Sequence, residues 1–407
     1  MKVVFVAGNS MPTQKAHGVH VAKQCEAFAA AGAAAELWYP APRGLPVSTP
    51  RDVFEFYGIG DDSFAVRSFG VPDVMRLERP LGRLFPYLFA LYSQVLGARV
   101  APLARRGRAD LYFTTDVDVA FWLTLTGAPT MWECHRVPRR LGRHELRRMF
   151  RSPSMHGVVP LTTITRDELV ALGMPEDRAL VMGEGVDVAA YDALPAEHEC
   201  RLQLGLPVDR PIVAYVGRFR TLDQEKGIPE LVRAMARVPV IDGKDPLLVC
   251  VGGPMDCVPG YRREAEAAGT PEHRLHFVDH VPSREVPYWI RAADVAVMPF
   301  PAHQHYARYM SPMKLFEYMA AGAPIVATDL PAVRDVLEHD RNAWLVPPDD
   351  IDALGRGIGE LLLDTERARR LATQARLDVE PYDWTMRARR LLAFAGAECR
   401  DRERSSP

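Results

Sequence analysis

The sequence lacks several features that would assign it to a specialised class of protein. Only six of its 407 residues are cysteine, and none stands in CxxC or another metal-ligand spacing, which argues against a disulfide framework or a cysteine zinc site. No run of 18 apolar residues occurs, and the first apolar run, residues 3–7, is too short for a signal peptide. The 50 basic and 52 acidic residues nearly cancel, so bulk charge does not recruit nucleic acid. We therefore expect a cytoplasmic globular protein with no membrane-spanning segment and no nucleic-acid partner.

Short apolar runs alternate with amphipathic stretches along most of the chain, which is typical of βα units that form a parallel sheet. In the first half, we expect strands at residues 2–7, 34–39, 110–114, 130–134, 158–162 and 179–182. In the second half, we expect strands at residues 211–217, 247–252, 275–278, 294–299, 324–328 and 343–346. Residues 19–31 read as a helix and the Pro- and Gly-rich residues 40–60 as a loop.

Two domains follow from this pattern. Residues 185–207 are polar and interrupted by Pro195, so the sequence predicts the inter-domain linker there. We expect an α/β fold of two doubly wound domains, residues 1–188 and 189–379. A helix over residues 380–400 is expected to pack back on the first domain.

The loop after the strand at 211–217 carries two cations at a helix start. It reads GRFRTLDQEKG, with Arg218 at the strand end and Lys226 just before the next helix. Fixed cations beside a helix N-terminus suit a diphosphate. Neither GxGxxG nor GxxxxGK[ST] occurs, which disfavours dinucleotide or Walker-type binding. The alternative is that both side chains are solvated loop charges.

A second motif, YMSPMKLFEYMAAGAPIVATD, begins at Tyr309. Ser311 is a candidate N-cap, which would place Lys314 and Glu317 near the start of a helix. A carboxylate there accepts paired ribose hydroxyls, and a lysine and backbone N–H groups meet phosphate. The alternative for Glu317 is a surface acid that only compensates the helix dipole.

The first domain offers candidate ligand-binding residues at the end of a strand and before a helix. Glu133 lies near the end of the strand at 130–134 and His135 directly follows it, and both are expected to face the ligand-binding cleft. Gly18 lies in the expected loop before the first helix, where it would let backbone approach phosphate or sugar, whereas His20 reads as helix surface. The alternative for His135 is a hydrogen-bonded core histidine.

Seven arginines occur in the sixteen residues from Arg136 to Arg151. Such density suits a phosphorylated acceptor or an anionic membrane face. The alternative is a solvated helix whose arginine stems cover the core.

Several segments in order resemble one known family. They are AHGVHV with its following helix, GVD at 185–187, VGRF…EKG, FVDHV at 277–281, ADVAVMP, the KLFEYMAAGAPIVATD block and a late helix with Trp384. The chain thus resembles the retaining glycosyltransferases of family 4, which implies a GT-B fold with two Rossmann-like domains facing a central cleft.

The resemblance also implies roles for individual residues. Arg218 and Lys226 would clasp the diphosphate of the donor, Glu317 would hold its ribose, and backbone around Val281 would read its base. His135 would contact the donor sugar and help to build the acceptor site, which we assign also to Glu133 and Arg136.

The sequence departs from the family at one position. The family commonly has two glutamates eight positions apart, and here Tyr309 stands at the earlier one. Tyr309 and Ser311 therefore offer hydroxyls rather than charge to the donor sugar.

The expected function is transfer of a hexose-type sugar from a nucleotide diphosphate donor, with uridine favoured, to a hydroxyl acceptor with retention. No metal or cofactor is expected, because the cations stabilise the leaving diphosphate. The acceptor is left open between a glycan, a lipid-linked acceptor and a small natural product. Peripheral contact with the inner face of a membrane through residues 136–151 is a further open alternative. The rival readings are a non-catalytic nucleotide-binding scaffold and a nucleotide-sugar epimerase.

Overall fold

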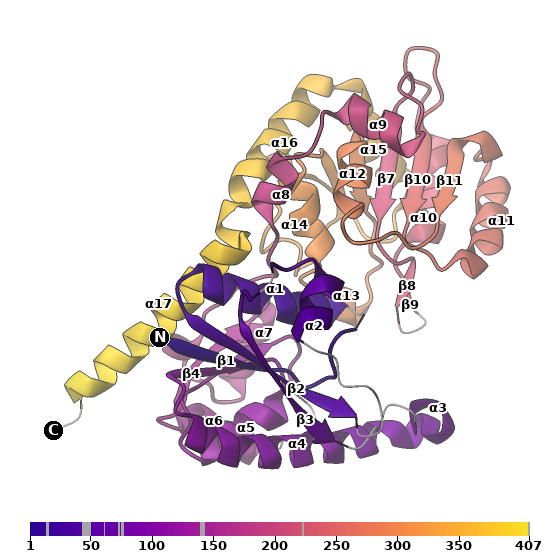
Figure 1. Cartoon of the computed structure of the whole chain (residues 1–407). Helices are drawn as coiled ribbons and strands as arrows, with labels where there is room; N and C mark the ends of the chain where they lie inside the picture. Colours follow the sequence, from indigo (N-terminus) through magenta and orange to yellow (C-terminus); the bar gives the residue numbers. More distant parts are fainter. Residues whose placement is uncertain are drawn as a thin grey trace. The chain divides into compact units, whose positions relative to one another are not determined.

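The computed structural model describes residues 1–13, 16–42, 50–60, 62–71, 74, 77–138, 143–221 and 224–405 (Figure 1). The chain forms two compact units. The N-terminal unit comprises Met1–Gly185 together with Trp384–Pro407, and the C-terminal unit comprises Val186–Asp383. The divisions fall within a few residues of the expected 188 and 379.

The N-terminal unit is built on a six-stranded parallel sheet of order β3-β2-β1-β4-β5-β6. Its strands are β1 (Lys2–Val6), β2 (Ala34–Pro42), β3 (Ala65–Val71), β4 (Leu111–Thr114), β5 (Thr130–Cys134) and β6 (Met155–Pro160). Its described helices are α1 (Ala16–Ala30), α2 (Pro50–Tyr57), α3 (Glu78–Leu81), α4 (Phe85–Gly107), α5 (Val117–Leu125), α6 (Arg143–Arg151), α7 (Thr163–Ala171) and α17 (Trp384–Ser405). The last helix, α17, packs on α1 and β6 although more than 200 residues separate it from β6 in the chain.

The C-terminal unit repeats the same architecture, with the order β11-β10-β7-β12-β13-β14. Its strands are β7 (Ile212–Val216), β10 (Leu247–Val251), β11 (Leu275–Val278), β12 (Val295–Met298), β13 (Ile325–Thr328) and β14 (Trp344–Val346), with a small hairpin of β8 (Arg220–Thr221) and β9 (Gln224–Glu225). Its described helices are α8 (Val188–Asp192), α9 (Glu197–Leu204), α10 (Ile228–Ala234), α11 (Val258–Ala268), α12 (Val286–Arg291), α13 (Gln304–Arg308), α14 (Met313–Ala320), α15 (Ile351–Leu363) and α16 (Thr365–Asp378).

In both sheets the strand order reverses between neighbouring strands, at β1/β4 and at β7/β12. Open α/β sheets bind ligands at the carboxyl ends of the strands beside such a switch point. The expected α/β class with two doubly wound sheets is therefore confirmed, and each unit has one edge on which to look for a site.

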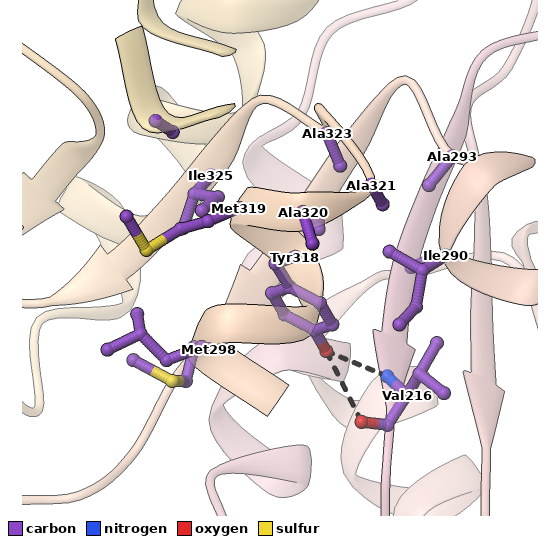
Figure 2. Close-up of a cluster of buried hydrophobic side chains, with 14 of the residues drawn as sticks. Val216, Ile290, Ala293, Met298, Tyr318, Met319, Ala320, Ala321, Ala323 and Ile325 are labelled. Carbon is purple, nitrogen blue, oxygen red and sulfur yellow. Dashed lines mark hydrogen bonds between the residues drawn. The ribbon is translucent and has the colours of Figure 1, made fainter. Parts of the chain in front are cut away.

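Helix α14 is fixed against the sheet of its unit by a buried apolar face and two hydrogen bonds between Tyr318 and Val216, the longer of which the Tyr318 hydroxyl donates to the Val216 carbonyl at 3.4 Å. The backbone N–H of Val216 in β7 donates to the Tyr318 hydroxyl at 2.9 Å (Figure 2). Figure 2 shows Met319 and Ala320 of the same helix among Met298, Ile325 and Ile290. This packing sets the position of the two polar residues of α14, Lys314 and Glu317.

The linker predicted at residues 185–207 is wrong for most of its length. Residues 188–192 and 197–204 form α8 and α9 within the C-terminal unit, where Val188, Tyr191 and Cys200 are buried in its core. These apolar residues are dispersed among charged ones, so their burial is not visible from the polar composition.

Three other local predictions need correction. The loop expected at 40–60 contains the end of β2 and the helix α2, and residues 43–49 lie outside the described part. The expected strand 179–182 runs beside β6, where the N–H groups of Leu180 and Met182 donate to the carbonyls of Val158 and Pro160 at 3.0 Å, but in the described part of the chain this pairing is an isolated parallel bridge rather than a full strand. The edge strand β3 was missed because most of its residues are half-buried or exposed and give no apolar run.

None of the described helices is long and apolar enough to cross a membrane.

Candidate functional sites of the two units

In the C-terminal unit, two glycines after β7 permit close contacts, Gly217 with Lys314 of α14 and Gly227 with Pro299 after β12. Gly217 directly follows β7 with a φ of +141°, and a Cβ on it would stand 2.5 Å from the Lys314 ammonium. Gly227 opens α10 with a φ of +87°, and a Cβ there would collide with the carbonyl oxygen of Pro299 after β12. Both positions require glycine, because positive φ and the absence of a side chain are needed at once.

Lys314 lies on the first turn of α14 and is buried with 8 % of its surface exposed. Its Nζ stands 3.6 Å from the centroid of the Tyr215 ring, which is a cation–π contact. Among the described residues this ammonium has no hydrogen-bond partner. Burial and then the neighbouring Lys226 hold the pKa of Lys314 well below its usual range. A buried ammonium without a partner is costly, so the site is built to receive an acceptor group.

Lys226 and Arg218 complete a group of three cations. Burial and then the charge of Arg218 lower the pKa of Lys226 to about 8. Arg218 itself is exposed after Gly217, while the next residue, Phe219, is fully buried and anchors the loop. Their mutual repulsion would be relieved by an anion bound among them. The structure thus brings together Arg218, Lys226 and Lys314 as the sequence predicts.

Glu317 lies one turn after Lys314 on α14. Burial raises the pKa of Glu317 to about 7, with the charge of Lys314 acting in the opposite direction. A half-buried carboxyl poised in this way can accept hydrogen bonds from a ligand that compensates its desolvation. This environment differs from that of a solvated surface acid.

The residues around α14 need one correction. The helix begins at Met313, with Pro312 rather than Ser311 at the N-cap position, because the ψ of Pro312 is +131° and therefore extended. Tyr309 is buried at the end of α13, and Ser311 is half-buried between the two helices. Val281 follows β11 in a loop and packs in part on the core.

In the N-terminal unit, His135 follows β5 at the carboxyl edge of the sheet. Its side chain is 36 % exposed and lines a cavity of about 360 Å³ with Asp116, Trp132, Arg136 and others. Asp116 caps α5 by accepting from the backbone N–H groups of Asp118 at 2.9 Å and Val119 at 3.2 Å. His135 and Arg136 are therefore both placed at one small cavity.

Glu133 is not accessible, contrary to the sequence-based expectation. It is completely buried, and its Oε1 stands 2.6 Å from His135 Nε2. Its Oε2 accepts from Arg387 at 2.5 Å, and the ring of His20 lies 2.9 Å from Oε1. A carboxylate with both oxygens occupied by protein groups contacts His135 rather than solvent.

The expectation that His20 lies on a helix surface is also wrong. His20 is buried in α1 between Glu133 and Glu184, with its Nδ1 2.6 Å from Glu184 Oε2. The signal was present in the sequence, because His20, Gln24 and Phe28 are spaced at i, i+4 and i+8 on the buried stripe of α1. Glu184 and Arg387 carried no local signal and were missed.

Gly18 lies inside the first turn of α1, not in a loop before it. A Cβ at this position would collide with the Tyr57 hydroxyl, which donates to the Thr13 carbonyl at 2.9 Å. Packing of α2 on this turn therefore accounts for glycine here without a ligand.

The arginine-rich segment is described only in part, since residues 139–142 lie outside the described ranges. Helix α6 is amphipathic, with Leu146, Met149 and Phe150 buried and the arginines at 143, 147, 148 and 151 exposed. Their solvated position is compatible with each of the interpretations given above.

Residues 210–364 match the family model described as Glycosyl transferases group 1. The chain is 32 % identical over 243 residues to the 2-deoxystreptamine N-acetyl-D-glucosaminyltransferase of Streptomyces fradiae, covering 59 % of this chain and 54 % of that protein. It is also 32 % identical over 243 residues to the D-inositol 3-phosphate glycosyltransferase of Xylanimonas cellulosilytica, covering 57 % and 55 %. The chain thus spans about half the length of the curated relatives it matches.

Solved structures share the fold over nearly the whole length. The Alr3699/HepE protein of Anabaena in complex with UDP has a TM-score of 0.68 at 19 % identity, covering 97 % of this chain and 98 % of that one. A glycosyltransferase from Rickettsia africae has a TM-score of 0.71 at 14 % identity, covering 98 % of both chains. Together with the two doubly wound sheets, these matches confirm the resemblance seen in the sequence: residues 210–364 match the glycosyl transferases group 1 family model, and the chain has the GT-B fold.

Proposed function

We propose that this protein is a retaining glycosyltransferase that moves a hexose-type sugar from a nucleoside diphosphate, with uridine favoured, to a hydroxyl of an acceptor. The observation that carries the proposal is the buried Lys314 ammonium without a hydrogen-bond partner among the described residues, with Lys226 and Arg218 beside it. Three cations at the carboxyl edge of a doubly wound sheet suit a diphosphate.

The donor assignment extends to the ribose and the base. Glu317 is one helical turn from Lys314, which suits a ligand whose ribose is adjacent to its diphosphate. The loop with Val281 follows β11 on the same edge of the sheet and is assigned to the base. UDP is favoured because the HepE protein, which has the same fold, is described in complex with UDP and with UDP-glucose.

The acceptor is proposed to bind in the N-terminal unit, at the cavity of about 360 Å³ lined by His135 and Arg136. The names of the two relatives above indicate cyclitol acceptors, 2-deoxystreptamine and inositol 3-phosphate. We therefore place small polyhydroxylated rings first among the acceptors to test, and the exposed Arg136 would meet a phosphate on such a ring.

The chemistry follows from where charge develops. As the bond between the anomeric carbon and the diphosphate oxygen breaks, negative charge grows on the diphosphate, where Arg218, Lys226 and Lys314 stabilise it. Positive charge grows on the sugar ring. The acceptor oxygen attacks the same face, and its proton passes to the departing phosphate oxygen, so the anomeric configuration is retained. No metal is required in this scheme, because three side-chain cations lie at the leaving group.

Ligand-induced thermal stabilisation with UDP, GDP, ADP, dTDP and NAD tests the donor site. A nucleotide at about 100 times its Kd stabilises the native state by about 2.7 kcal/mol, so one nucleoside diphosphate should raise the unfolding midpoint well above the others. Transfer from the matching nucleotide sugar to inositol 3-phosphate and 2-deoxystreptamine is then assayed, with the product anomer read by NMR.

Arg218→Ala should lower kcat by about 10² to 10³ and leave the unfolding midpoint unchanged, because Arg218 is exposed. Arg263→Ala, an exposed arginine on α11, is the matched control. Wild-type turnover by Arg218→Ala would remove the diphosphate role. Absence of a shift with every nucleotide would instead favour the non-catalytic scaffold, and interconversion of the donor sugar without an acceptor would favour the epimerase.

A further inference from the structure

Glu133 is the centre of a buried polar network in the N-terminal unit. It is completely buried near the end of β5 and contacts three side chains. The rings of His135 and His20 approach its Oε1 at 2.6 and 2.9 Å, and the guanidinium of Arg387 donates to its Oε2 at 2.5 Å. Both oxygens are therefore held, and the carboxylate has a single orientation.

The outer members of the network come from distant parts of the chain. Arg387 of α17 is completely buried and also donates to the Gly183 carbonyl at 2.9 Å and to the Gln24 side chain. His20 of α1 contacts Glu184 at 2.6 Å through Nδ1. Elements at both ends of the described chain thus meet at Glu133 of β5, the strand that directly precedes His135.

The charges of the network balance without His135. Burial lowers the pKa of His20, but Glu133 and Glu184 raise it to about 10, so the ring is an imidazolium. Burial raises the pKa of Glu133, but Arg387 and then His20 hold it well below its usual range. Two cations therefore face two carboxylates, and such mutual pairing is what buried charges require.

A metal site does not fit this arrangement, although His20, Glu133 and His135 each place one ligand atom within 4.8 Å of the others. The guanidinium of Arg387 already occupies one oxygen of Glu133, and His20 is protonated between two carboxylates. A divalent cation would have to displace a proton and lie beside a buried arginine. The cluster is therefore a hydrogen-bond network.

We propose that Arg387, His20 and Glu184 act as positioning residues for His135: they fix Glu133, and Glu133 fixes the His135 tautomer that carries its proton on Nε2. His135 then has Nδ1 as its one free ring acceptor at the cavity that it lines with Asp116 and Arg136. Nδ1 accepts a hydrogen bond from a hydroxyl group of a bound sugar or acceptor. This last step rests on the function proposed above, whereas the tautomer does not.

The structure also explains why so many groups support one ring. A histidine at a strand end turns about its side-chain bonds and exchanges tautomers unless its other nitrogen is held. Glu133 lies two residues before His135, close enough to contact the ring. A carboxylate without other contacts, however, would itself rotate. The contact with Arg387 removes that freedom.

The test is NMR of the full chain labelled with 15N at histidine, which distinguishes protonated from unprotonated ring nitrogens. The His135 signals are identified by their loss in His135→Gln. In spectra recorded at alkaline pH, His135 of the wild type should show a proton on Nε2 and none on Nδ1. A proton on Nδ1 instead would overturn the proposal.

Arg387→Met should mix the two tautomers of His135, and Arg387→Lys, which keeps a cation, should restore part of the Nε2-protonated form. Arg390→Met, an exposed arginine of the same helix, is the control and should match the wild type. Unchanged His135 signals in folded Arg387→Met would refute the positioning role. If Arg387→Met does not fold, the double variant Glu133→Gln/Arg387→Met is used, because it removes the buried charge of Glu133 together with that of Arg387. This variant should also mix the two tautomers of His135.

Kinetics separate this inference from the proposed function. Arg387→Met should lower kcat about tenfold or more while the Kd for UDP, which has no sugar, changes less than twofold, because the residues proposed for the diphosphate, the ribose and the base lie in the other unit. Mixed tautomers with wild-type kcat would refute the substrate contact of His135. A wild type with the Nε2 tautomer but no nucleotide binding or transfer would leave the positioning role supported and refute the proposed function.

Discussion

The depressed pKa of Lys226 predicts that donor affinity falls as the pH rises. The pKa of this lysine is lowered from 10.5 to about 8, first by burial and then by Arg218. Only the charged form pairs with a diphosphate, and that form is lost as the pH rises through 8. Binding of an anion stabilises the ammonium, so the complex takes up a proton at alkaline pH.

The size of the effect follows from the charged fraction. With a pKa of about 8, roughly nine-tenths of Lys226 is charged at pH 7 and about one-tenth at pH 9. Because the apparent Kd is the intrinsic Kd divided by the competent fraction, the Kd for UDP should rise about tenfold between pH 7 and pH 9. The terminal phosphate of UDP has a pKa of about 6, so its charge changes little over this range.

Isothermal titration calorimetry at pH 7, 8 and 9, repeated in two buffers of different ionisation enthalpy, measures both the Kd and the proton uptake. Lys226→Arg keeps its charge at pH 9 and should remove most of the slope. A Kd that changes less than twofold in the wild type would contradict the reasoning. A slope in Lys226→Arg equal to that of the wild type would move the titration to another group, with Lys314 the first candidate.

Three further substitutions test the site and its support. In urea unfolding, Gly227→Ala should destabilise the protein by more than Gly322→Ala. Both glycines have positive φ, but a Cβ at Gly227 would meet the Pro299 carbonyl oxygen, whereas nothing lies within 4 Å of a Cβ at Gly322. Gly322→Ala should therefore cost only about 1 to 2 kcal/mol, for the backbone strain, and an equal loss at Gly227 would mean that its loop moves aside. Tyr318→Phe should lower the free energy of unfolding by about 1 to 3 kcal/mol, because the buried backbone N–H donor in β7 loses its acceptor, and a loss near zero would show that this N–H finds another. Glu317→Gln should weaken binding of UDP but not of inorganic pyrophosphate, and weaker pyrophosphate binding would contradict the ribose contact. Because burial raises the pKa of Glu317 to about 7, its ionised form prevails above that pH. The substitution should therefore also abolish any gain in UDP affinity between pH 6 and pH 8.

The sequence predicted well those features that depend on neighbouring residues. Five of the six strands expected in the first half and all six in the second exist, because an apolar run between turn residues marks a buried parallel strand. The cations Arg218, Lys226 and Lys314 were found because each follows a strand or opens a helix, and the carboxyl ends of parallel strands share one edge of the sheet.

The short elements were harder to predict. Helices α8 and α9 lie in a polar segment of the sequence and are stabilised by scattered apolar residues, such as Tyr191 and Cys200, that are buried in the core. The edge strand β3 buries few side chains and so carries a weak pattern. In both cases the partner surface, not the local composition, decides the structure.

Only the tertiary structure showed what surrounds His135. The sequence placed His135 and Glu133 at a strand end, but it gave no reason to join them to residues 20, 184 and 387, which lie far away in the chain. Secondary structure can be predicted from the periodicity of residues a few positions apart. A buried charge, in contrast, is compensated by whichever opposite charge the fold brings near it. The sequence by itself thus determined the two sheets and the cations of the C-terminal unit, and folding decided which polar groups of the N-terminal unit are buried together.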